Sequence, residues 1–221
     1  MAVAIDGPVG AGKSSIAREA AKRLGFIYCD TGALYRAVGL FCVRNGVNTK
    51  NAADVASQLD KVHIEIRLVN GTQLVFLNGE NVSEEIRLPE ISMAASAVSA
   101  VPEVRAALLD LQRETAAKSS AIMDGRDIGT VVLPNADVKI FLTASPEIRA
   151  KRRFDELKAK GSDTTFEDVL RDLNERDYAD THRETAPLKQ ADDAVLADTS
   201  ELDFEQSVEL VCGIIKGKTA L

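Results

Sequence analysis

Short apolar runs recur along the chain, and segments of helical periodicity separate them. Five runs have the length and composition of buried strands: 2–5, 26–29, 121–123, 138–142 and 194–197. This alternation favours an α/β fold in which parallel strands form a doubly wound sheet. A polar or glycine-bearing segment follows each run, and ligands of such sheets bind at the carboxyl ends of the strands. We therefore expect a five-stranded parallel sheet with its functional groups in the loops that follow the strands.

Helical periodicity is clear after the first run, where Ile16, Ala20 and Leu24 recur at fourfold spacing and Gly25 provides a stop. Ser145-Pro146 is a helix start, because serine caps the first turn and proline fits its first position. Further helices are predicted at 102–117, from 146 to Gly161, at 165–180 and at 204–216.

The period changes to two between residues 62 and 81. Apolar and polar residues alternate from Val62 to Leu68, and a second apolar run at 74–77 follows Asn70-Gly71. This pattern predicts a small antiparallel hairpin, inserted into the parallel sheet as a module for one substrate. His63 lies on the polar side of the alternation, and we interpret it as a solvated surface histidine.

A glycine-rich segment joins the first apolar run to the first helix. Its spacing is G-x-x-x-x-G-K-S, formed by Gly7, Pro8, Val9, Gly10, Ala11, Gly12, Lys13 and Ser14. Glycines let backbone N–H groups turn toward phosphate oxygens, and the start of the helix adds partial positive charge. We expect this P-loop to bind ATP, with Lys13 at the β and γ phosphates and Ser14 as a ligand of Mg²⁺.

Composition and charge narrow the possible partners. The chain has 221 residues, 45% of them hydrophobic, which suits one α/β core with small insertions. A net charge of −7 disfavours binding of long nucleic acid. Three widely spaced cysteines without histidine partners indicate reduced thiols rather than a zinc site. No apolar run approaches the roughly 20 residues that span a bilayer. We expect a cytoplasmic monomer with no membrane partner.

Arginines are the second group of candidate functional residues, because phosphoryl transfer depends on positioned phosphates and neutralised charge. Arg36 and Arg126 follow strand ends, and Arg176 and Arg183 flank Asp180 on one face of a predicted helix. Another helix carries Arg149, Lys151, Arg152 and Arg153. For Arg149 and Lys151, a surface salt-bridge ladder remains an open interpretation.

At these residues the chain resembles the bacterial cytidylate kinases of the nucleoside monophosphate kinase group, nearly from end to end. The matching stretches are Ile5-Asp6-Gly7-Pro8 before the loop, residues 30–36 (DTGALYR), residues 124–130 (DGRDIGT) and residues 176–188. The resemblance implies transfer of the γ-phosphoryl group of ATP to CMP or dCMP. It also implies a single domain with a core at 1–32, 119–150 and 165–221, a monophosphate-binding region at 33–118 and a helical lid at 151–164.

The resemblance further implies the roles of individual residues. Arg36, Arg126 and Arg183 would hold the acceptor phosphate, Arg176 and Asp180 the sugar, and Ser96, Arg105 and Asp127 the base. Thr31 would contact CMP through its hydroxyl, and Asp124 would hold Mg²⁺. Lys13, Arg126, Asp127 and Arg153 would be catalytic, and Arg152 would bind ATP. Asp127 suits cytosine because its carboxylate accepts from the amino group that uracil lacks.

Two other functions are considered at the sequence level. A P-loop kinase for another small acceptor, such as shikimate, gluconate or UMP, would share the core but would not need residues 30–36 and 176–183 around a nucleotide. A GTP-dependent switch would need an Asn-Lys-x-Asp motif and a D-x-x-G loop, and the sequence contains neither in the expected places.

Overall fold

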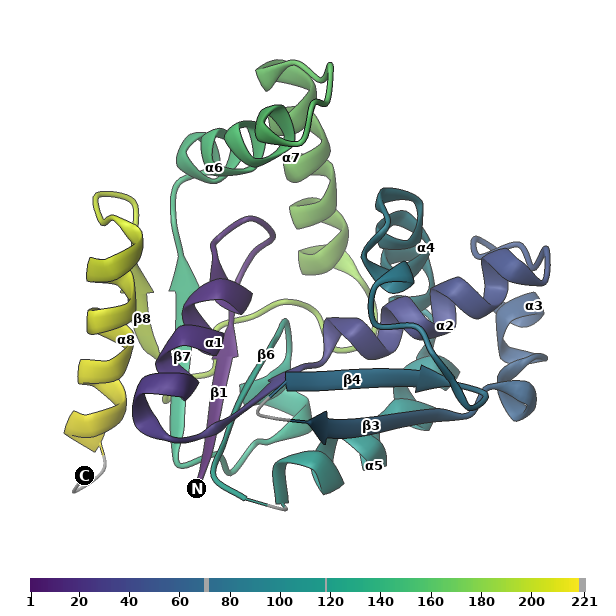
Figure 1. Ribbon diagram of the computed structural model, residues 1–221, viewed down its shortest axis with the longest axis horizontal. Coiled ribbons are helices and arrows are strands. Elements are labelled where there is room, and N and C mark those ends of the chain that lie inside the picture. Colours follow the sequence, from purple (N-terminus) through teal and green to yellow (C-terminus); the bar gives the residue numbers. More distant parts are fainter. Residues whose placement is uncertain (70–71, 118, 219–221) are drawn as a thin grey trace. The chain divides into compact units, whose positions relative to one another are not determined.

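The computed structural model describes residues 1–69, 72–117 and 119–218 and divides them into two compact units (Figure 1). The first unit consists of Met1–Phe26 and Ala121–Leu221, and the second of Ile27–Ser120. The second unit is one continuous stretch of chain, which lies between the first and third predicted strands.

The predicted five-stranded parallel sheet is confirmed. Its strand order is β2-β6-β1-β7-β8, with central strand β1 (Ala2–Asp6) between β6 (Ala121–Gly125) and β7 (Val138–Thr143). The edges are β2 (Ile27–Asp30), which begins the second unit, and β8 (Val195–Asp198). In β1, Val3, Ala4 and Ile5 are fully buried, which explains why this strand reads as a continuous apolar run. The edge strand β8 is not buried in the same way, since its Leu196 is 55% exposed.

The strands extend farther than the apolar runs, so acidic residues fall inside their carboxyl ends. Asp6 ends β1, Asp30 ends β2, Asp198 ends β8, and Asp124 is the next-to-last residue of β6. Ile5 lies beside Asp124 on one side and beside Ile140 on the other. The polar groups therefore gather at the edge of the sheet where ligands of doubly wound folds bind.

Four α-helices of the first unit form where the sequence predicts them. They are α1 (Lys13–Leu24), α6 (Pro146–Ala159), α7 (Phe166–His182) and α8 (Phe204–Lys218). The Ser145 hydroxyl caps α6 by accepting from Ile148 N, and Thr165 caps α7 by accepting from Asp168 N. Helices α1 and α8 lie side by side, and α6 packs against α7 (Figure 1).

A short π-helical segment, Ile128–Val132, follows β6 and has no signal in the sequence pattern.

Among its described residues, the second unit contains six helical segments and a separate antiparallel sheet. The main helices are α2 (Gly32–Arg44), α3 (Ala52–Ala56), α4 (Pro89–Ser99) and α5 (Pro102–Ala117), joined by the 3₁₀ turns η1 (Leu59–Lys61) and η2 (Glu85–Arg87). Helix α2 packs closely on α4 at Gly39, which has no side chain. A Cβ there would lie only 2.9 Å from Ala95 N. Two apolar clusters, one around Leu40 and Ile91 and one around Val38 and Val104, form the core of this unit.

The predicted hairpin is present, and it carries a third strand. The order is β3-β4-β5, with β3 (Ile64–Val69), β4 (Thr72–Leu77) and β5 (Glu80–Asn81) all antiparallel. The turn expected at Asn70-Gly71 lies outside the described residues. Gly79 adopts φ +85 in the turn between β4 and β5, as the Asn78-Gly79 pair requires.

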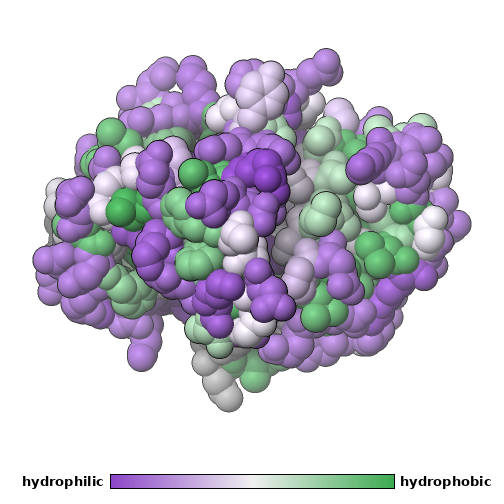
Figure 2. Space-filling model, turned by 90° about the horizontal axis from the view of Figure 1, so that it is seen from above, coloured by the Kyte–Doolittle hydropathy of each residue, from purple (hydrophilic) through white to green (hydrophobic). Residues whose placement is uncertain are grey.

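The surface is mainly hydrophilic on the face shown in Figure 2, where hydrophobic residues form small separate groups. Within the described ranges, no single helix is both long and apolar enough to span a membrane. Helices α4 and α5 pass that test only when joined, and they are bent by 101° at their junction.

Candidate functional site

The P-loop connects β1 to α1, and three glycines give it its shape. Gly7, Gly10 and Gly12 have φ values of 150°, 75° and 85°, which L side chains rarely adopt. At Gly7 a Cβ would also lie 1.9 Å from Leu142 O in the neighbouring strand. Only glycine fits here, and the chain can therefore turn at once from β1 into the loop.

Lys13 is the first residue of α1, and its ammonium group folds back over the loop. Nζ donates to Pro8 O over 2.6 Å, and the side chain is buried. Burial lowers the pKa of Lys13 well below its usual value, and the nearby Arg126 guanidinium lowers it further. The carboxylates of Asp124, Asp180 and Asp6 partly oppose this shift, and a polyanionic ligand would stabilise the charged lysine further.

Ser14 and Asp124 are the two sequence-predicted metal ligands, and the structure places them in contact. Ser14 Oγ donates to Asp124 Oδ2 over 2.8 Å. Within the described ranges, no group of three or more His, Cys, Asp or Glu side chains could hold a metal ion. One hydroxyl and one carboxylate fit Mg²⁺, since this ion retains several waters and is completed by nucleotide phosphates.

Asp6 was not among the predicted site residues, yet it organises the segment that follows β6. Its carboxylate accepts from Ile128 N over 2.8 Å and from Gly129 N over 2.7 Å. Burial raises the pKa of Asp6 to about 6, and these two amide hydrogen bonds only partly oppose that shift. The position of Asp6 at a strand end was visible in the sequence, but its bonding partners were not.

Arg126, Asp127, Asp180 and Arg183 form one network of alternating charge. Arg126 Nε donates to Asp180 Oδ2 over 2.7 Å, and Arg183 Nη2 donates to Asp127 Oδ1 over 3.3 Å. Arg183 Nη1 also lies 4.0 Å from Asp180 Oδ1, which joins the two pairs. Asp127 and the Arg183 side chain are buried. Arg176 lies one turn before Asp180 on α7 and is exposed.

The four clustered basic residues of α6 have three different environments. Lys151 pairs with Asp155 over 2.6 Å on the surface, as a salt-bridge ladder would. Arg153 is 43% exposed and pairs with Glu156. Arg152 donates to Thr199 O over 2.6 Å and to Leu202 O over 3.2 Å. The contacts of Arg152 and Arg153 thus group them with the β8–α8 connection and the surface of α6, not with the Arg126 network.

Arg149 differs from the surface ladder considered at the sequence level, because its side chain is only 5% exposed. Nη1 lies 2.6 Å from Asp177 Oδ2 and donates to Val9 O over 2.8 Å, while Nε donates to Ala144 O over 2.9 Å. Neither Arg149 nor Asp177 was predicted as a site residue. The sole sequence signal was that Asp177 lies three residues before Asp180.

The second unit holds a separate group of predicted residues around Asp30. Asp30 Oδ1 accepts from Ala33 N over 3.0 Å, and Oδ2 accepts from Arg36 Nη2 over 2.8 Å. Asp30 N donates to Gln73 Oε1 of β4 over 2.8 Å, and Gln73 Nε2 donates to Asp30 O over 3.1 Å. The inserted sheet therefore helps to hold this loop. Arg36 Nε is buried and has no hydrogen-bond partner among the described residues. Thr31 is buried beside Asp30 at the start of α2.

Ser96 and Arg105 belong to the helices α4 and α5 of the second unit. Arg105 is buried, donates to Ser99 O over 3.2 Å, and places its guanidinium 5.5 Å from the centre of the Tyr35 ring. Ser96 is half-buried one turn before Ser99, and its carbonyl accepts from the Ser99 hydroxyl. Both predicted residues are therefore hydrogen-bonded to Ser99, at the end of α4.

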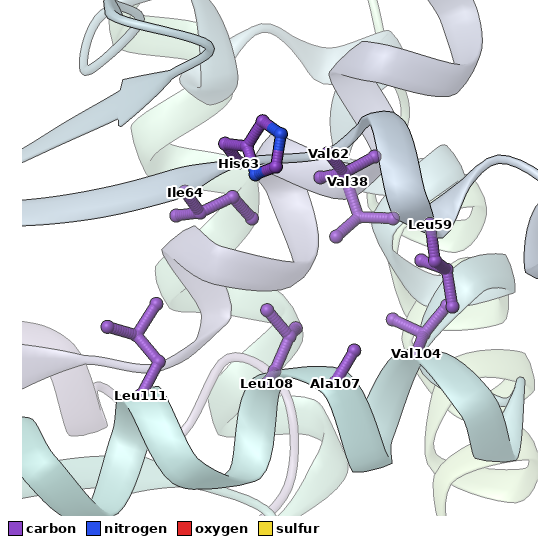
Figure 3. A pocket seen from close by; sticks show the side chains of 9 residues that line it. All are labelled: Val38, Leu59, Val62, His63, Ile64, Val104, Ala107, Leu108 and Leu111. Atoms are coloured by element: carbon purple, nitrogen blue, oxygen red, sulfur yellow. The ribbon is translucent and has the colours of Figure 1, made fainter.

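The second unit also has an open cavity of about 270 Å³ between β3, α2 and α5 (Figure 3). Ala107, Leu108 and Leu111 of α5 face Val62 and Ile64 across it (Figure 3). His63 is the one ionisable residue among its lining residues and is exposed, as predicted. An apolar cavity of this kind offers no cradle for a phosphate.

The doubly wound sheet, the P-loop and the cationic groups around it define the class of protein as a P-loop kinase. The family model for cytidylate kinase matches residues 3–217. The cytidylate kinase of Caldicellulosiruptor bescii is 51% identical over 209 residues, which cover 95% of this chain and 92% of that protein. The cytidylate kinase of Carboxydothermus hydrogenoformans is 48% identical over 218 residues, with 99% and 98% covered. The chain belongs to the cytidylate kinase family.

A solved structure agrees with this fold. The crystal structure of an uncharacterized protein from Eubacterium ventriosum superposes with a TM-score of 0.55 at 14% identity, covering 100% of this chain and 99% of that one. At this level of identity the similarity concerns the fold alone.

Proposed function

We propose that the protein phosphorylates CMP and dCMP with ATP, yielding CDP or dCDP and ADP. Family membership and the P-loop support ATP as the phosphoryl donor. The observation that carries the proposal is that buried Lys13 lies against the P-loop, with the Arg126 guanidinium near enough to lower its pKa further. Asp180 pairs with Arg126 over 2.7 Å, and the donor and acceptor phosphates would add negative charge beside both cations.

The P-loop residues Gly7 to Ser14 form the proposed donor half. Backbone N–H groups of the loop would bind the phosphates, and Lys13 would contact the β and γ groups. Arg152 and Arg153 were predicted to assist from a lid at 151–164. The contacts of these two arginines give that part of the proposal less support than the P-loop has.

Mg²⁺ is proposed to bind with ATP at Ser14 and Asp124, whose hard oxygen donors lie 2.8 Å apart. When bound, the ion supplies positive charge that neutralises the phosphate oxygens. The chain itself orients this pair: Ser14 is fixed by the first turn of α1, and Asp124 by the end of β6.

The acceptor half is proposed to comprise Arg36, Arg126 and Arg183 around the CMP phosphate. The unpartnered buried Nε of Arg36 supports this role, because a phosphate oxygen would satisfy it. Arg176 and Asp180 would bind the sugar. Thr31, Ser96, Arg105 and Asp127 would contact CMP, with the last three reading the base.

Phosphoryl transfer would proceed directly between the two nucleotides. The CMP phosphate is already anionic, with a second pKa near 6, so its oxygen can attack the γ-phosphorus without a general base. The bond from the γ-phosphorus to the β–γ bridging oxygen breaks, and ADP leaves. Lys13 and Arg126 offset the repulsion of the two anions, and their fixed positions hold the reacting atoms in line.

Cytosine selectivity is proposed to arise at Asp127 and Arg105. The carboxylate accepts from the cytosine amino group, and a guanidinium donates to N3 and O2. Uracil would place a carbonyl against the carboxylate, which costs roughly hundredfold or more in kcat/KM. We further propose that the chain works in the cytoplasm, where ATP is available, and that it is a monomer. The core, the monophosphate-binding region and the lid are proposed to have the boundaries expected from the sequence.

One assay tests the reaction. The purified protein is given fixed ATP and Mg²⁺, and ADP release is followed with CMP, dCMP, UMP, AMP and shikimate in parallel. Fast release with CMP and dCMP and slow release with the others is expected. Equal or faster release with shikimate or AMP would assign the chain to another acceptor class. Release that does not depend on any acceptor would indicate hydrolysis.

A further inference from the structure

The apex of the P-loop is bound from both sides by two residues outside the loop. Val9 N donates to Asp177 Oδ1 over 3.2 Å, and Val9 O accepts from Arg149 Nη1 over 2.8 Å. Asp177 and Arg149 also pair with each other over 2.6 Å. One peptide unit of the loop is thus held between a carboxylate of α7 and a guanidinium of α6.

Apolar contacts reinforce this attachment. A Cβ on Gly10 would lie 3.1 Å from Leu173 Cδ1 and 3.3 Å from Arg149 Cβ, so the loop passes close to both helices. Val9 packs against the cluster formed by Ala150, Val169 and Leu173. The contacts at Val9 and Gly10 are independent of each other, and both dock the loop on α6 and α7.

Helix α7 carries the acceptor residues on the same side. Asp177 and Asp180 lie three residues apart on α7, and Arg183, three residues farther on, is the C-cap residue in extended conformation. Asp177 binds the loop, Asp180 binds Arg126, and Arg183 binds Asp127. The donor loop and two of the proposed phosphate-binding arginines, Arg126 and Arg183, are therefore attached to one helix and its C-cap.

We propose that Arg149 and Asp177 are positioning residues that fix the P-loop against α7, and thereby set the distance between the donor triphosphate and the acceptor phosphate. This inference rests on the proposed kinase function. Neither residue needs to touch a nucleotide, because both act through the peptide unit of Val9. Their buried ion pair makes the attachment directional, since a displaced loop would leave both charges poorly paired.

The test separates positioning from stability by measuring the two substrates independently. Asp177→Ala and Arg149→Ala are each expected to raise the Kd for ATP about tenfold and to lower kcat by a similar factor, while the KM for CMP changes less than about twofold. The double variant is expected to lose no more than the worse single variant, because both changes break one linkage. Arg149→Lys, which keeps the cation, is expected to recover part of kcat.

Asp172→Asn is the matched control, because Asp172 is an exposed carboxylate on the same helix. It is expected to behave as the unmodified protein. Asp177→Asn keeps the shape of the side chain and is used if Asp177→Ala does not fold, which a thermal melt shows. A variant with reduced kcat but unaltered ATP affinity and KM would overturn the proposal, since it indicates only fewer folded molecules. Parallel losses for ATP and CMP would overturn it as well.

The two proposals fail in different ways. If the unmodified protein does not phosphorylate CMP, the proposed function is wrong, and ATP titration of the variants still tests the attachment. If CMP is phosphorylated but the Asp177 and Arg149 variants bind ATP normally, only the positioning role is wrong.

Discussion

Arg126 Nε donates to Asp180 Oδ2 over 2.7 Å, and this bond links the end of β6 to the last turn of α7. Asp180→Asn would weaken it and remove a charged acceptor from the proposed sugar site. We expect the KM for CMP to rise about tenfold while the KM for ATP stays unchanged, because charged hydrogen bonds are worth more than neutral ones. Initial-rate kinetics with each substrate varied in turn measure both values.

Asp110→Asn serves as the control, since Asp110 is an exposed carboxylate of α5. A rise in both KM values for Asp180→Asn would contradict a role confined to the acceptor.

Lys13→Ala is expected to lower kcat about a thousandfold or more, because charge on the transferred phosphate loses its nearest compensation. Burial already lowers the pKa of this lysine, so its charge costs stability in the folded state. The variant should therefore melt no lower than the unmodified protein. ATP should raise the melting temperature of the unmodified protein and have little effect on the variant.

Lys22→Ala, at an exposed position on the same helix, should leave both the rate and the effect of ATP unchanged. A Lys13→Ala protein that keeps its turnover would remove Lys13 from the mechanism.

Asp6 is expected to make the free energy of unfolding depend on pH. Burial raises the pKa of Asp6 from 3.8 to about 6. Between these two pH values the folded state therefore holds a proton that the unfolded state releases. Its contribution to the free energy of unfolding is therefore fully present below the unfolded pKa and is lost as pH rises through about 6. Asp6→Asn removes this titration.

The free energy of unfolding of the unmodified protein, measured against that of Asp6→Asn, should rise by up to about 3 kcal/mol as pH falls from about 7 to 4. Urea titrations at several pH values give this difference. A difference that does not vary with pH would mean that Asp6 titrates normally.

Gly7→Ala is expected to destabilise the fold by about 3 kcal/mol or more, because φ of +150 and a Cβ 1.9 Å from Leu142 O leave no room for a side chain. Gly213→Ala is the control. Gly213 lies within α8 with nothing within 4 Å of its Cβ position, so alanine should add about 0.5–1 kcal/mol there. Denaturant unfolding of both variants measures the contrast, and equal stability would contradict the steric argument.

The sheet and the main helices could be predicted from sequence because their signals are local. Apolar runs such as 138–142 and the fourfold spacing of Ile16, Ala20 and Leu24 depend only on neighbouring residues. The third strand β5 was missed because two residues carry no period. The π-helical segment at Ile128–Val132 was missed because Asp6, far away in sequence, holds its amides.

The residues of the candidate site also fall into two groups, those with a local sequence signal and those that depend on packing. The P-loop was recognisable because its chemistry lies in eight consecutive residues. Ser14 and Asp124 were each predicted to bind Mg²⁺, and their direct contact is a finding of the structure. Arg149 could not be distinguished from a surface residue, since burial depends on the packing of α6 against α7 and the loop. Roles of Arg176, Ser96 and Arg105 rest on resemblance and stay predictions.

The threefold spacing of Asp177, Asp180 and Arg183 limits how the length of this chain can vary. An inserted residue between Asp177 and Asp180 would rotate one contact about 100° away from the other, because each residue turns a helix by that angle. Insertions in the 160–165 connection would leave all three contacts in phase. Length variation tolerated by the protein should thus accumulate before α7 and be absent between Asp177 and Asp180.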